Sequence, residues 1–337
     1  MKKVIFFDVQ DYEVEFLRSA CGGRFEFELI KEPLNDLSDL TGSRKEAEII
    51  SCFTTSRVSS EVLEHFGNLK LIALRSVGFN HIDTDFCKSH GIYVENTPNY
   101  GNMTVAEFAL ALLFDVTRKV TNSYNDLQKS VINPHKTIGV EIFGKTIGIV
   151  GLGAIGAEMA RLANGIGMKI LGFDIKEREA LKEKYHVQYT DFEGLVRNSD
   201  FISLHSPLTK DNYHIFNQEI FEMMKPSAFI INTARGELID TQALYNALID
   251  KKIAGAGLDV LESEEILTAP EYLIDIGRMT PQSLQKTVLN NRLLQLDNVI
   301  VTPHIAYDTN EAINRILNTT VENIFAFCEG KIQNNVY

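Results

Sequence analysis

The sequence predicts an α/β protein of two domains, each built on a parallel β-sheet. Short apolar runs, rich in Val and Ile, alternate with helical patterns through almost all of the chain. Near-continuous apolar strands of this kind are typical of parallel sheets that helices cover on both faces. The length of 337 residues and the hydrophobic content of 45% suit two cores better than one.

The apolar runs that we expect to be strands fall into two groups along the chain. Two long helical stretches, 104–119 and 308–327, bracket the second group and suit crossings between domains. In the first stretch, Thr104 and Glu107 have the spacing of a capping box. We therefore expect one domain from residues 1–101 and 304–337, with residues 102–303 inserted as the second. The first group of strands is VIFF (4–7), EIISCF (48–53) and LKLIAL (69–74), and the second is TIGIV (146–150), KILGF (169–173), DFISLHS (200–206), AFIIN (228–232), AGAGLDV (254–260) and NVIVT (298–302).

Composition and charge argue against several classes of protein. A formal net charge of −12 without a dense Lys/Arg cluster disfavours nucleic-acid and anionic-membrane partners, which bind through concentrated positive charge. No window approaches the roughly 18 apolar residues of a membrane span, and Asp8 interrupts the apolar N-terminal run that could otherwise start a signal peptide. The four cysteines are far apart and form no C-x-x-C pair, so we expect a cytoplasmic protein with reduced thiols and no metal site.

The run KTIGIVGLGAIGAEMARLANGIGMKILGFDIK carries the most specific local motif. Gly151, Gly153 and Gly156 fill the pattern G-x-G-x-x-G between an expected strand and an expected helix. Gly151 permits the tight turn, Gly153 lets a pyrophosphate approach the backbone, and Gly156 allows the helix to pack closely. This pattern predicts a dinucleotide-binding turn.

The acidic residue that completes this motif is Asp174, at the end of the next strand. It lies 174 − 156 = 18 residues after Gly156, where a carboxylate accepts hydrogen bonds from the hydroxyls of the adenosine ribose. A carboxylate there repels a 2′-phosphate, so we expect NAD in preference to NADP. The nearby cations Lys176 and Arg178 weaken that preference slightly.

Polar residues follow four of the expected strands, at the sheet edge where open α/β sheets bind ligands. A hydride transfer at a hydroxyl-bearing carbon needs an acid/base for the hydroxyl proton, and histidine titrates in the right range. A carboxylate on the other imidazole nitrogen would orient the ring, and an arginine would grip a substrate carboxylate with two hydrogen bonds. The strand-end residues are His205, Ser206 and Pro207; Thr233, Ala234 and Arg235; Asp259 and then Glu264; and Pro303 and His304.

Each of these charged residues also has a structural interpretation. Arg235 could form an ion pair with Asp259, and Glu264 could be a solvated charge in the acidic run ESEE. His304 could be an ordinary loop histidine, and its position alone does not rank it above His205. The remaining histidines have no such placement and are expected to be structural: His65, His81, His90, His135, His186 and His214.

Taken together, these motifs resemble those of the NAD-dependent D-isomer-specific 2-hydroxyacid dehydrogenase family, over essentially the whole chain. The resemblance is carried, in chain order, by VGLGAIG with the aspartate at 174, HSPLT, NTARGELID, AGLDV with the glutamate at 264, and TPHIA. It implies two Rossmann-like domains with parallel sheets, in which the nucleotide-binding domain is inserted into a flavodoxin-like substrate domain. Two features depart from the family. Glu265 stands where many members have proline, and 304 − 264 = 40 residues separate the glutamate from the histidine, with Thr280 and Pro281 in the pattern of a helix start.

The resemblance also implies roles for single residues. Arg235 is expected to bind the substrate carboxylate and carbonyl, His304 to be the acid/base, and Glu264 to orient and charge His304, with Asp259 supporting the cluster near the nicotinamide. Phe53, Val77, Gly78, Tyr100 and Tyr307 are expected to join Arg235 around the substrate. The cofactor positions, besides the three glycines, are Ala154, Ile155, Asp174, Ser206, Pro207, Asn212, Thr233, Ala234, Arg235 and Asp259, with His205 lining the cofactor.

Within the family the chain looks most like the D-lactate dehydrogenase branch. We therefore expect NADH-dependent reduction of pyruvate to D-lactate, by a homodimer whose contact includes the helix near 102–118. The alternatives are another 2-hydroxy acid, such as 2-hydroxyisocaproate, glycerate or 3-phosphoglycerate, and an NAD-sensing regulatory protein on the same scaffold. The intact set of Arg235, Glu264 and His304 weighs against the regulatory alternative.

Overall fold

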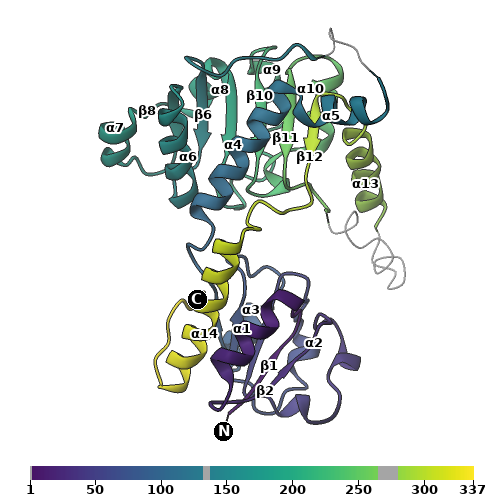
Figure 1. Ribbon diagram of the computed structural model, residues 1–337, viewed down its shortest axis with the longest axis vertical. Coiled ribbons are helices and arrows are strands. Elements are labelled where there is room, and N and C mark those ends of the chain that lie inside the picture. Colours follow the sequence, from purple (N-terminus) through teal and green to yellow (C-terminus); the bar gives the residue numbers. More distant parts are fainter. Residues whose placement is uncertain (1, 132–136, 265–279) are drawn as a thin grey trace. The chain divides into compact units, whose positions relative to one another are not determined.

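The computed structural model describes residues 2–131, 137–264 and 280–337, so His135 and Glu265 lie outside the described residues. The chain divides into two compact units, Met1–Tyr100 with Thr309–Tyr337, and Gly101–Asp308 (Figure 1). From the sequence we expect the boundaries after residues 101 and 303, whereas the structure has residues 101 and 304–308 in the second unit. Among the described residues, no helix is long and apolar enough to cross a membrane.

The first unit contains a parallel five-stranded sheet in the order β2-β1-β3-β4-β5. Alternate side chains of β1 face opposite sides, as the strand period requires. Val4 and Phe6 pack with α1 and α14, whereas Ile5 and Phe7 pack with α2 and α3. The elements are β1 (Lys3–Phe6), α1 (Asp11–Cys21), β2 (Glu26–Leu29), η1 (Leu37–Asp39), η2 (Gly42–Glu46), β3 (Ile49–Cys52), α2 (Ser60–Leu63), β4 (Leu71–Leu74), α3 (Thr84–Ser89), β5 (Tyr93–Glu95) and α14 (Asn310–Cys328).

The second unit contains a parallel seven-stranded sheet in the order β12-β11-β10-β9-β6-β7-β8. Helices α4 and α6 cover one face, and α8, α9 and α10 cover the other (Figure 1). The elements are α4 (Asn102–Arg118), α5 (Val120–Gln128), β6 (Thr146–Val150), α6 (Ala154–Gly165), β7 (Lys169–Phe173), α7 (Glu179–Tyr185), β8 (Gln188–Tyr189), α8 (Phe192–Asn198), β9 (Phe201–Leu204), α9 (Gln218–Met223), β10 (Phe229–Asn232), η4 (Gly236–Leu238), α10 (Thr241–Ile249), β11 (Gly255–Leu258), α13 (Pro281–Leu293) and β12 (Val299–Val301).

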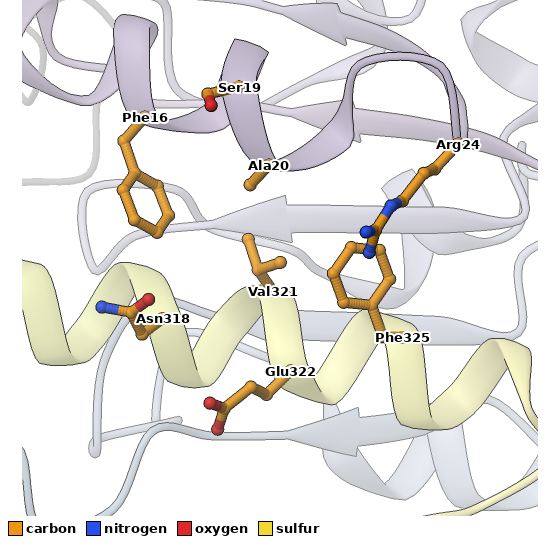
Figure 2. A pocket seen from close by; sticks show the side chains of 8 residues that line it. All are labelled: Phe16, Ser19, Ala20, Arg24, Asn318, Val321, Glu322 and Phe325. Carbon is orange, nitrogen blue, oxygen red and sulfur yellow. The ribbon is translucent and has the colours of Figure 1, made fainter.

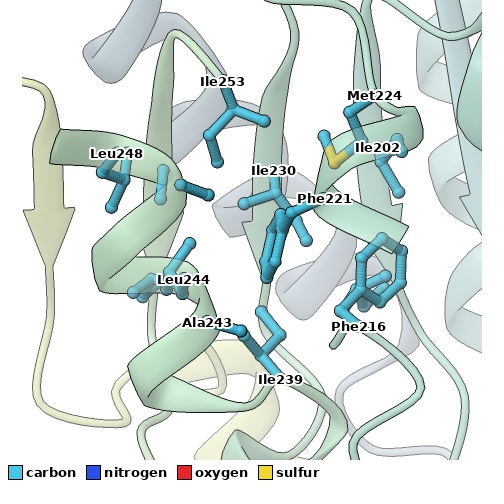
Figure 3. Close-up of a cluster of buried hydrophobic side chains, with 14 of the residues drawn as sticks. Ile202, Phe216, Phe221, Met224, Ile230, Ile239, Ala243, Leu244, Leu248 and Ile253 are labelled. Atoms are coloured by element: carbon cyan, nitrogen blue, oxygen red, sulfur yellow. The ribbon is translucent and has the colours of Figure 1, made fainter. Parts of the chain in front are cut away.

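Strand β10 lies inside this sheet and is anchored by a large apolar cluster. Ile230 is fully buried and belongs to the cluster that packs α9 and α10 against the sheet, together with Phe221 and Leu244 (Figure 3). Burying a side chain of this size stabilises the fold by about 1.5–3 kcal/mol. The carboxyl end of β10 is therefore a rigid support.

The strand register aligns the ends of neighbouring strands at one edge of the sheet. Asn232 at the end of β10 pairs with Leu204 of β9 and Leu258 of β11, and Leu258 pairs with Val301 of β12. The residues that follow these strands consequently form a row along that edge. Strand order also reverses between β6 and β9, the position at which open α/β sheets bind ligands.

All nine expected strands are present, but other predictions of local structure need correction. The capping box at Thr104 is wrong, because α4 begins at Asn102 after Gly101 and Thr104 is buried inside the helix. The strands β2, β5 and β8 were not predicted, since each is a short strand at the edge of its sheet. The helix start at Thr280 and Pro281 is confirmed, with the Thr280 hydroxyl accepting from the Ser283 N–H over 3.1 Å.

Candidate active site

The turn that follows β10 is held by its own polar groups. The amide of Asn232 donates to the carbonyl of Arg235 over 2.8 Å and accepts from the N–H of Ala234 over 3.0 Å. Gly236 then packs directly on a neighbouring turn, because a Cβ there would stand 2.1 Å from the carbonyl carbon of Leu261. Only glycine permits this approach. The backbone of Arg235 is therefore fixed at the strand end.

The guanidinium of Arg235 is half-buried, and its one hydrogen bond within the described residues is a local one. Its Nη1 donates to the carbonyl of Ala234 over 2.6 Å. The structural alternative, an ion pair with Asp259, does not form in the described part of the chain. The Asp259 carboxylate instead accepts from the Thr302 hydroxyl at 2.5 Å and from the N–H groups of Ile305 and Ala306 at 3.0 and 2.8 Å. Arg235 thus retains donors that can meet an external anion.

His304 and Glu264 form a close pair at the same edge. Nδ1 of His304 lies 2.6 Å from Oε1 of Glu264, and the other carboxylate oxygen accepts from the Leu261 N–H over 3.0 Å. This pairing contradicts the two structural alternatives, a solvated Glu264 and an ordinary loop histidine. It also leaves Nε2 as the nitrogen that can exchange a proton with a bound molecule.

The backbone of His304 is in the left-handed region, with φ of 56°. Its N–H donates to the carbonyls of Asp259 and Thr302 over 2.9 and 3.0 Å, which holds this conformation. A non-glycine residue at positive φ is strained, and such strain gathers at functional sites. The three hydrogen bonds to the Asp259 carboxylate come from residues on both sides of His304, so Asp259 stabilises the turn that carries His304.

Charges around the imidazole set its protonation. Partial burial and the positive charge of Arg235 lower the pKa of His304. The hydrogen bond to Glu264 and the negative charges of Glu264 and Asp259 raise this pKa by more. The net effect raises the pKa of His304 above the ordinary histidine value. Burial also raises the pKa of Asp259, and its hydrogen bonds offset only part of that rise. A histidine held in this way is suited to donate a proton near neutral pH.

The glycine-rich turn between β6 and α6 has the shape that a dinucleotide requires. Gly151 has φ of 86°, and a Cβ there would meet the Ser206 N at 2.6 Å. A Cβ on Gly156 would stand 2.0 Å from the Gly151 carbonyl oxygen, so α6 packs tightly on the turn. Gly153 faces open space, and no side chain of the described residues caps α6. The first N–H groups of α6, including those of Ala154 and Ile155, are thus available to a pyrophosphate.

Asp174 lies beside this turn at the end of β7. Its carboxylate accepts from the Leu152 N–H over 2.6 Å and from the Lys176 N–H over 3.0 Å. The next side chain, Ile175, is fully exposed. The structure therefore brings the carboxylate and the glycine-rich turn together, as a ribose site demands.

Two buried polar atoms along this edge have no hydrogen-bond partner among the described residues. They are the hydroxyl of Thr233, after β10, and Nδ1 of His205, after β9. Burial lowers the pKa of His205 to about 4, and its Nε2 lies 2.8 Å from the Ser203 hydroxyl, whereas His304 is paired with a carboxylate. Buried polar atoms are normally paired, and these two fit contacts to a bound cofactor. The residues present therefore fit NAD.

The remaining cofactor candidates lie in the loop after β9. Ser206 follows His205 and approaches Gly151 through its backbone, and Pro207 is exposed. The amide of Asn212 accepts from the Thr209 N–H and donates to the Pro207 carbonyl, both over 2.7 Å. In this structure Asn212 closes the loop.

The predicted substrate residues are divided between the two units. In the first unit, the Phe53 N–H donates to the Asp8 carboxylate over 3.1 Å, and the Gly78 carbonyl accepts from the Ser76 hydroxyl over 2.7 Å. Val77 is exposed and Tyr100 is the last residue of the unit's first segment, whereas Tyr307 belongs to the second unit. A common role around a substrate stays a prediction for these residues.

A surface groove of about 340 Å³ lies between α1 and α14 of the first unit (Figure 2). The guanidinium carbon of Arg24 lies 4.8 Å from the centre of the Phe325 ring, and Glu322 also lines the groove. None of the candidate residues lines this groove. The chemistry-bearing groups lie at the strand ends instead.

Sequence reasoning missed two groups at this edge. The Thr302 hydroxyl binds Asp259, and nothing in its sequence context indicated that contact. Glu262 belongs to the same acidic run as Glu264, yet it is 2% exposed and paired with His214. A buried carboxylate inside an acidic run cannot be told from a solvated one by sequence pattern, because both have the same residue type.

Several known proteins are similar to this chain in sequence and in structure. The family model described as "D-isomer specific 2-hydroxyacid dehydrogenase, NAD binding domain" matches residues 110–306. The chain is 37% identical to a glyoxylate reductase of Thermococcus litoralis, over 93% of the chain and 90% of that protein. It is 35% identical to the D-lactate dehydrogenase of Escherichia coli, over 96% of the chain and 95% of that protein. The solved structure of D-lactate dehydrogenase from Aquifex aeolicus, complexed with NAD and lactic acid, matches with a TM-score of 0.85 and 37% identity, over 97% of this chain and 96% of that one.

Proposed function

The chain belongs to the D-isomer specific 2-hydroxyacid dehydrogenase family, and from that premise we propose that it reduces small 2-keto acids with NADH, pyruvate to D-lactate foremost. It has two Rossmann-like α/β units, and the family's NAD-binding domain lies within the second. The observation that carries the proposal is the pair of His304 and Glu264, 2.6 Å apart at the strand ends near Arg235. We propose residues 101–308 as the cofactor-binding domain and the other unit as the substrate domain.

The residues that would hold the cofactor are those of the second unit's sheet edge. The N-terminus of α6 would hold the pyrophosphate, and Asp174 the ribose. Thr233 and Asp259 would lie towards the nicotinamide. When bound, NADH supplies the hydride that reduces the keto carbon.

The proton comes from His304. Its Nε2 donates to the carbonyl oxygen of the substrate, while Nδ1 stays bonded to Glu264, which keeps the ring oriented and stabilises its charge. Asp259 holds the turn that presents His304. In the reverse direction neutral His304 takes the hydroxyl proton.

Arg235 binds the substrate carboxylate. A guanidinium presents two parallel N–H donors that match the two oxygens of a carboxylate. Because its backbone is fixed by Asn232 and Gly236, Arg235 sets which face of the keto carbon is presented, and hence the D product.

Glyoxylate is the second candidate substrate. The similarity to a glyoxylate reductase over 93% of the chain favours it, and glyoxylate is the smallest 2-keto acid. The similarity to the D-lactate dehydrogenase of Aquifex aeolicus favours pyruvate, because it covers 97% of this chain with a TM-score of 0.85. We therefore rank pyruvate first.

The test is NADH oxidation against pyruvate, glyoxylate, hydroxypyruvate and 2-ketoisocaproate, with chiral analysis of the product. We expect the highest kcat/KM with pyruvate and D-lactate as the product. A clear preference for glyoxylate would replace pyruvate with the second candidate. L-lactate as the product, or no turnover of any 2-keto acid, would contradict the proposed reaction.

Replacing Asp174 by alanine should weaken NADH binding by about 10- to 100-fold, because two hydrogen bonds between a carboxylate and the ribose hydroxyls are lost. Fluorescence titration measures the affinity for NADH. The affinity of Asp174→Asn should fall between those of the wild type and Asp174→Ala, because asparagine keeps one acceptor oxygen. Glu193→Gln, on an exposed ion pair of the same unit, is the control. Unchanged NADH affinity in Asp174→Ala would refute the ribose contact.

We also propose a cytoplasmic homodimer. The inner face of α4 is buried within its own unit, including Ala109 and Leu113, so the contact surface is expected to extend onto α5. Val120, Tyr124 and Leu127 of α5 are 59%, 62% and 61% exposed. An apolar helix face of this kind fits burial against a second copy.

A further inference from the structure

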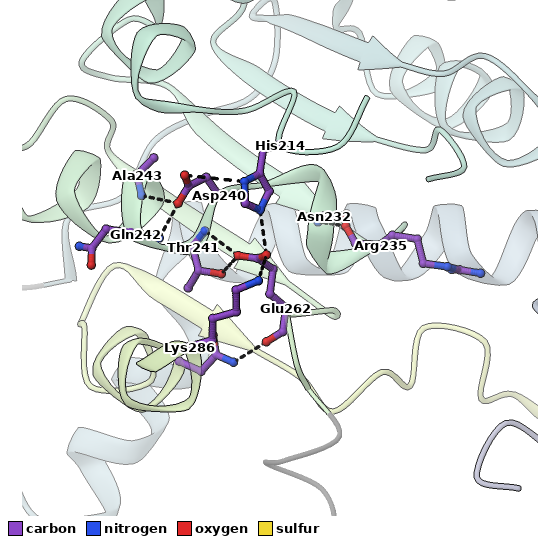
Figure 4. Close-up of polar contacts among 10 residues, drawn as sticks. His214, Asn232, Arg235, Asp240, Thr241, Gln242, Ala243, Glu262 and Lys286 are labelled. Carbon is purple, nitrogen blue, oxygen red and sulfur yellow. Dashed lines mark hydrogen bonds and ion pairs between the residues drawn. The ribbon is translucent and has the colours of Figure 1, made fainter. Parts of the chain in front are cut away.

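Glu262 is a buried carboxylate that binds three separate parts of the second unit. It is 2% exposed, and His214 Nε2 and Lys286 Nζ lie 2.8 and 2.6 Å from its Oε1. Its other oxygen accepts from both the N–H and the hydroxyl of Thr241, over 3.0 and 2.6 Å. Figure 4 shows these groups converging on the carboxylate from the loop after β9, from the start of α10 and from α13.

The charge of Glu262 is well compensated. Burial alone would raise its pKa, but the hydrogen bonds from Lys286, Thr241 and His214 hold the pKa below the ordinary glutamate value. The other titratable groups facing this cluster are Asp240, 3.8 Å from His214, and Tyr213, which faces Lys286. Glu262 is therefore ionised at neutral pH, and loss of any one partner leaves a buried charge less satisfied.

Two turns of the candidate active site meet at Glu262. Thr241 begins α10 three positions after the end of the 3-10 turn that follows Arg235, and Glu262 stands two positions before Glu264. The contact of Gly236 with Leu261 joins the same two turns. In addition, the Asn290 amide donates to the Glu262 carbonyl over 2.8 Å, which ties this backbone to α13.

The junction between the turns is closely packed. Gly236, Thr241, Leu261 and Glu262 line a cavity of about 10 Å³ there, together with six other residues. A space of that size is at the lower limit for one water molecule. Because close-packed interiors transmit displacements, a shift of one turn changes the position of the other.

We propose that Glu262 is a positioning residue of the reaction: it holds the turn of Arg235 and the turn of Glu264 in one arrangement, and so sets the bond between Glu264 and His304. This inference rests on the proposed function. Glu262 itself touches neither His304 nor Arg235 in the described contacts. Its effect passes through the backbone of Leu261, whose N–H donates to Glu264.

The experiment compares three variants. Glu262→Gln removes the charge but keeps the shape, and Thr241→Val removes one donor to Glu262 with little change in volume. The matched control is Asp200→Asn, because Asp200 is a partly buried carboxylate that, like Glu262, pairs with a lysine: it lies 2.8 Å from Lys225 and accepts from the Thr146 N–H over 2.9 Å. Asp200 lies at the amino ends of β6 and β9, the opposite edge from the site.

The primary measurement is the pKa of His304 by NMR titration of its ring proton, assigned with His304→Gln. This measurement does not depend on turnover or on a bound cofactor. The pKa reports on Glu264, Asp259 and Arg235, which are the charged groups that face His304. Thermal unfolding and the KM and kcat for pyruvate are recorded for the same variants.

In Glu262→Gln we expect the pKa of His304 to fall towards the ordinary histidine value and kcat/KM to fall by about 10- to 100-fold, since a misplacement near 1 Å has effects of that order. Thr241→Val should lower the pKa of His304 and kcat/KM as well, but by smaller amounts. If Glu262→Gln does not fold, Thr241→Val takes its place in the test. Asp200→Asn should lower Tm alone. If Glu262→Gln lowers Tm like Asp200→Asn but leaves the His304 titration unchanged, the positioning role is wrong. No turnover by the wild type would instead refute the proposed function, and the NMR titration would still decide the role of Glu262.

Discussion

Replacing His304 by glutamine should lower kcat for pyruvate reduction by about 100- to 10,000-fold, the range that a positioned acid/base contributes. NADH binding should stay close to that of the wild type, because His304 lies after β12, whereas the glycine-rich turn follows β6. Steady-state kinetics and a fluorescence titration of NADH measure the two effects. Glutamine cannot supply the proton that the carbonyl oxygen needs.

The left-handed backbone at His304 calls for a paired variant. Asparagine adopts positive φ more readily than glutamine, so His304→Asn separates backbone strain from loss of the acid. Both variants should lose kcat alike. His65→Gln, an exposed histidine of the other unit, should keep wild-type kinetics. Wild-type turnover in His304→Gln would show that another group is the acid.

The same assignment predicts the pH dependence of the wild type. Protonated His304 is present below its pKa and is lost as the pH rises through it. The pKa is raised by Glu264 and Asp259, so kcat/KM for reduction should stay level to a pH above the ordinary histidine value and then fall. For oxidation of D-lactate, kcat/KM should instead rise as the pH rises through the pKa of His304, because that direction needs the neutral ring. In Glu264→Gln the fall in the reduction profile should move to lower pH.

Arg235→Gln should raise the KM for pyruvate by about 100-fold or more, since charge-assisted bonds of a buried pair are worth roughly 2–5 kcal/mol. It should also lower kcat, because the substrate is no longer held in one orientation. Arg235→Lys keeps the charge but loses the two-pronged geometry, so it should recover only part of the loss. The pyruvate dependence of the initial rate measures each variant.

Two results would argue against any specific role of Arg235, and a third would argue against its contact with the substrate carboxylate. One is a lower Tm with unchanged KM, which would make Arg235 a structural residue. The other is an equal change in Arg197→Gln, the control on an exposed helical ion pair of the same unit. A change confined to NADH affinity would also move Arg235 from the substrate to the cofactor.

Part of the site could be predicted because its residues are close in sequence. The turn from Gly151 to Gly156 depends on local backbone geometry and on the contact between one strand and the next helix. Asp174 follows the neighbouring strand of that βαβ unit, so its approach to Leu152 is a consequence of strand order. A turn of this kind can be predicted from sequence, because it needs certain residue types at fixed spacing.

Other features depend on contacts that sequence spacing does not reveal. Thr104 and Glu107 have the capping-box spacing, but the burial of Thr104 in α4 overrides that local preference. The edge strand β2 has the sequence EFEL, whose alternating charges do not form a continuous apolar run. Tertiary packing, which decides both cases, is absent from a local pattern.

The sequence by itself determined nine of the twelve described strands and their order, the glycine-rich turn and the set of strand-end residues, because periodicity and spacing specify local structure. Only the tertiary structure decided which charges meet. Asp259 pairs with the turn after β12 and leaves Arg235 free of it, whereas Glu264 pairs with His304 across 304 − 264 = 40 residues of chain. Glu262 and Glu264 are the same residue type in one acidic run, yet one is buried under His214 and Lys286 and the other bonds to His304. Such partners are distant in sequence and are selected by burial and charge compensation in the folded chain.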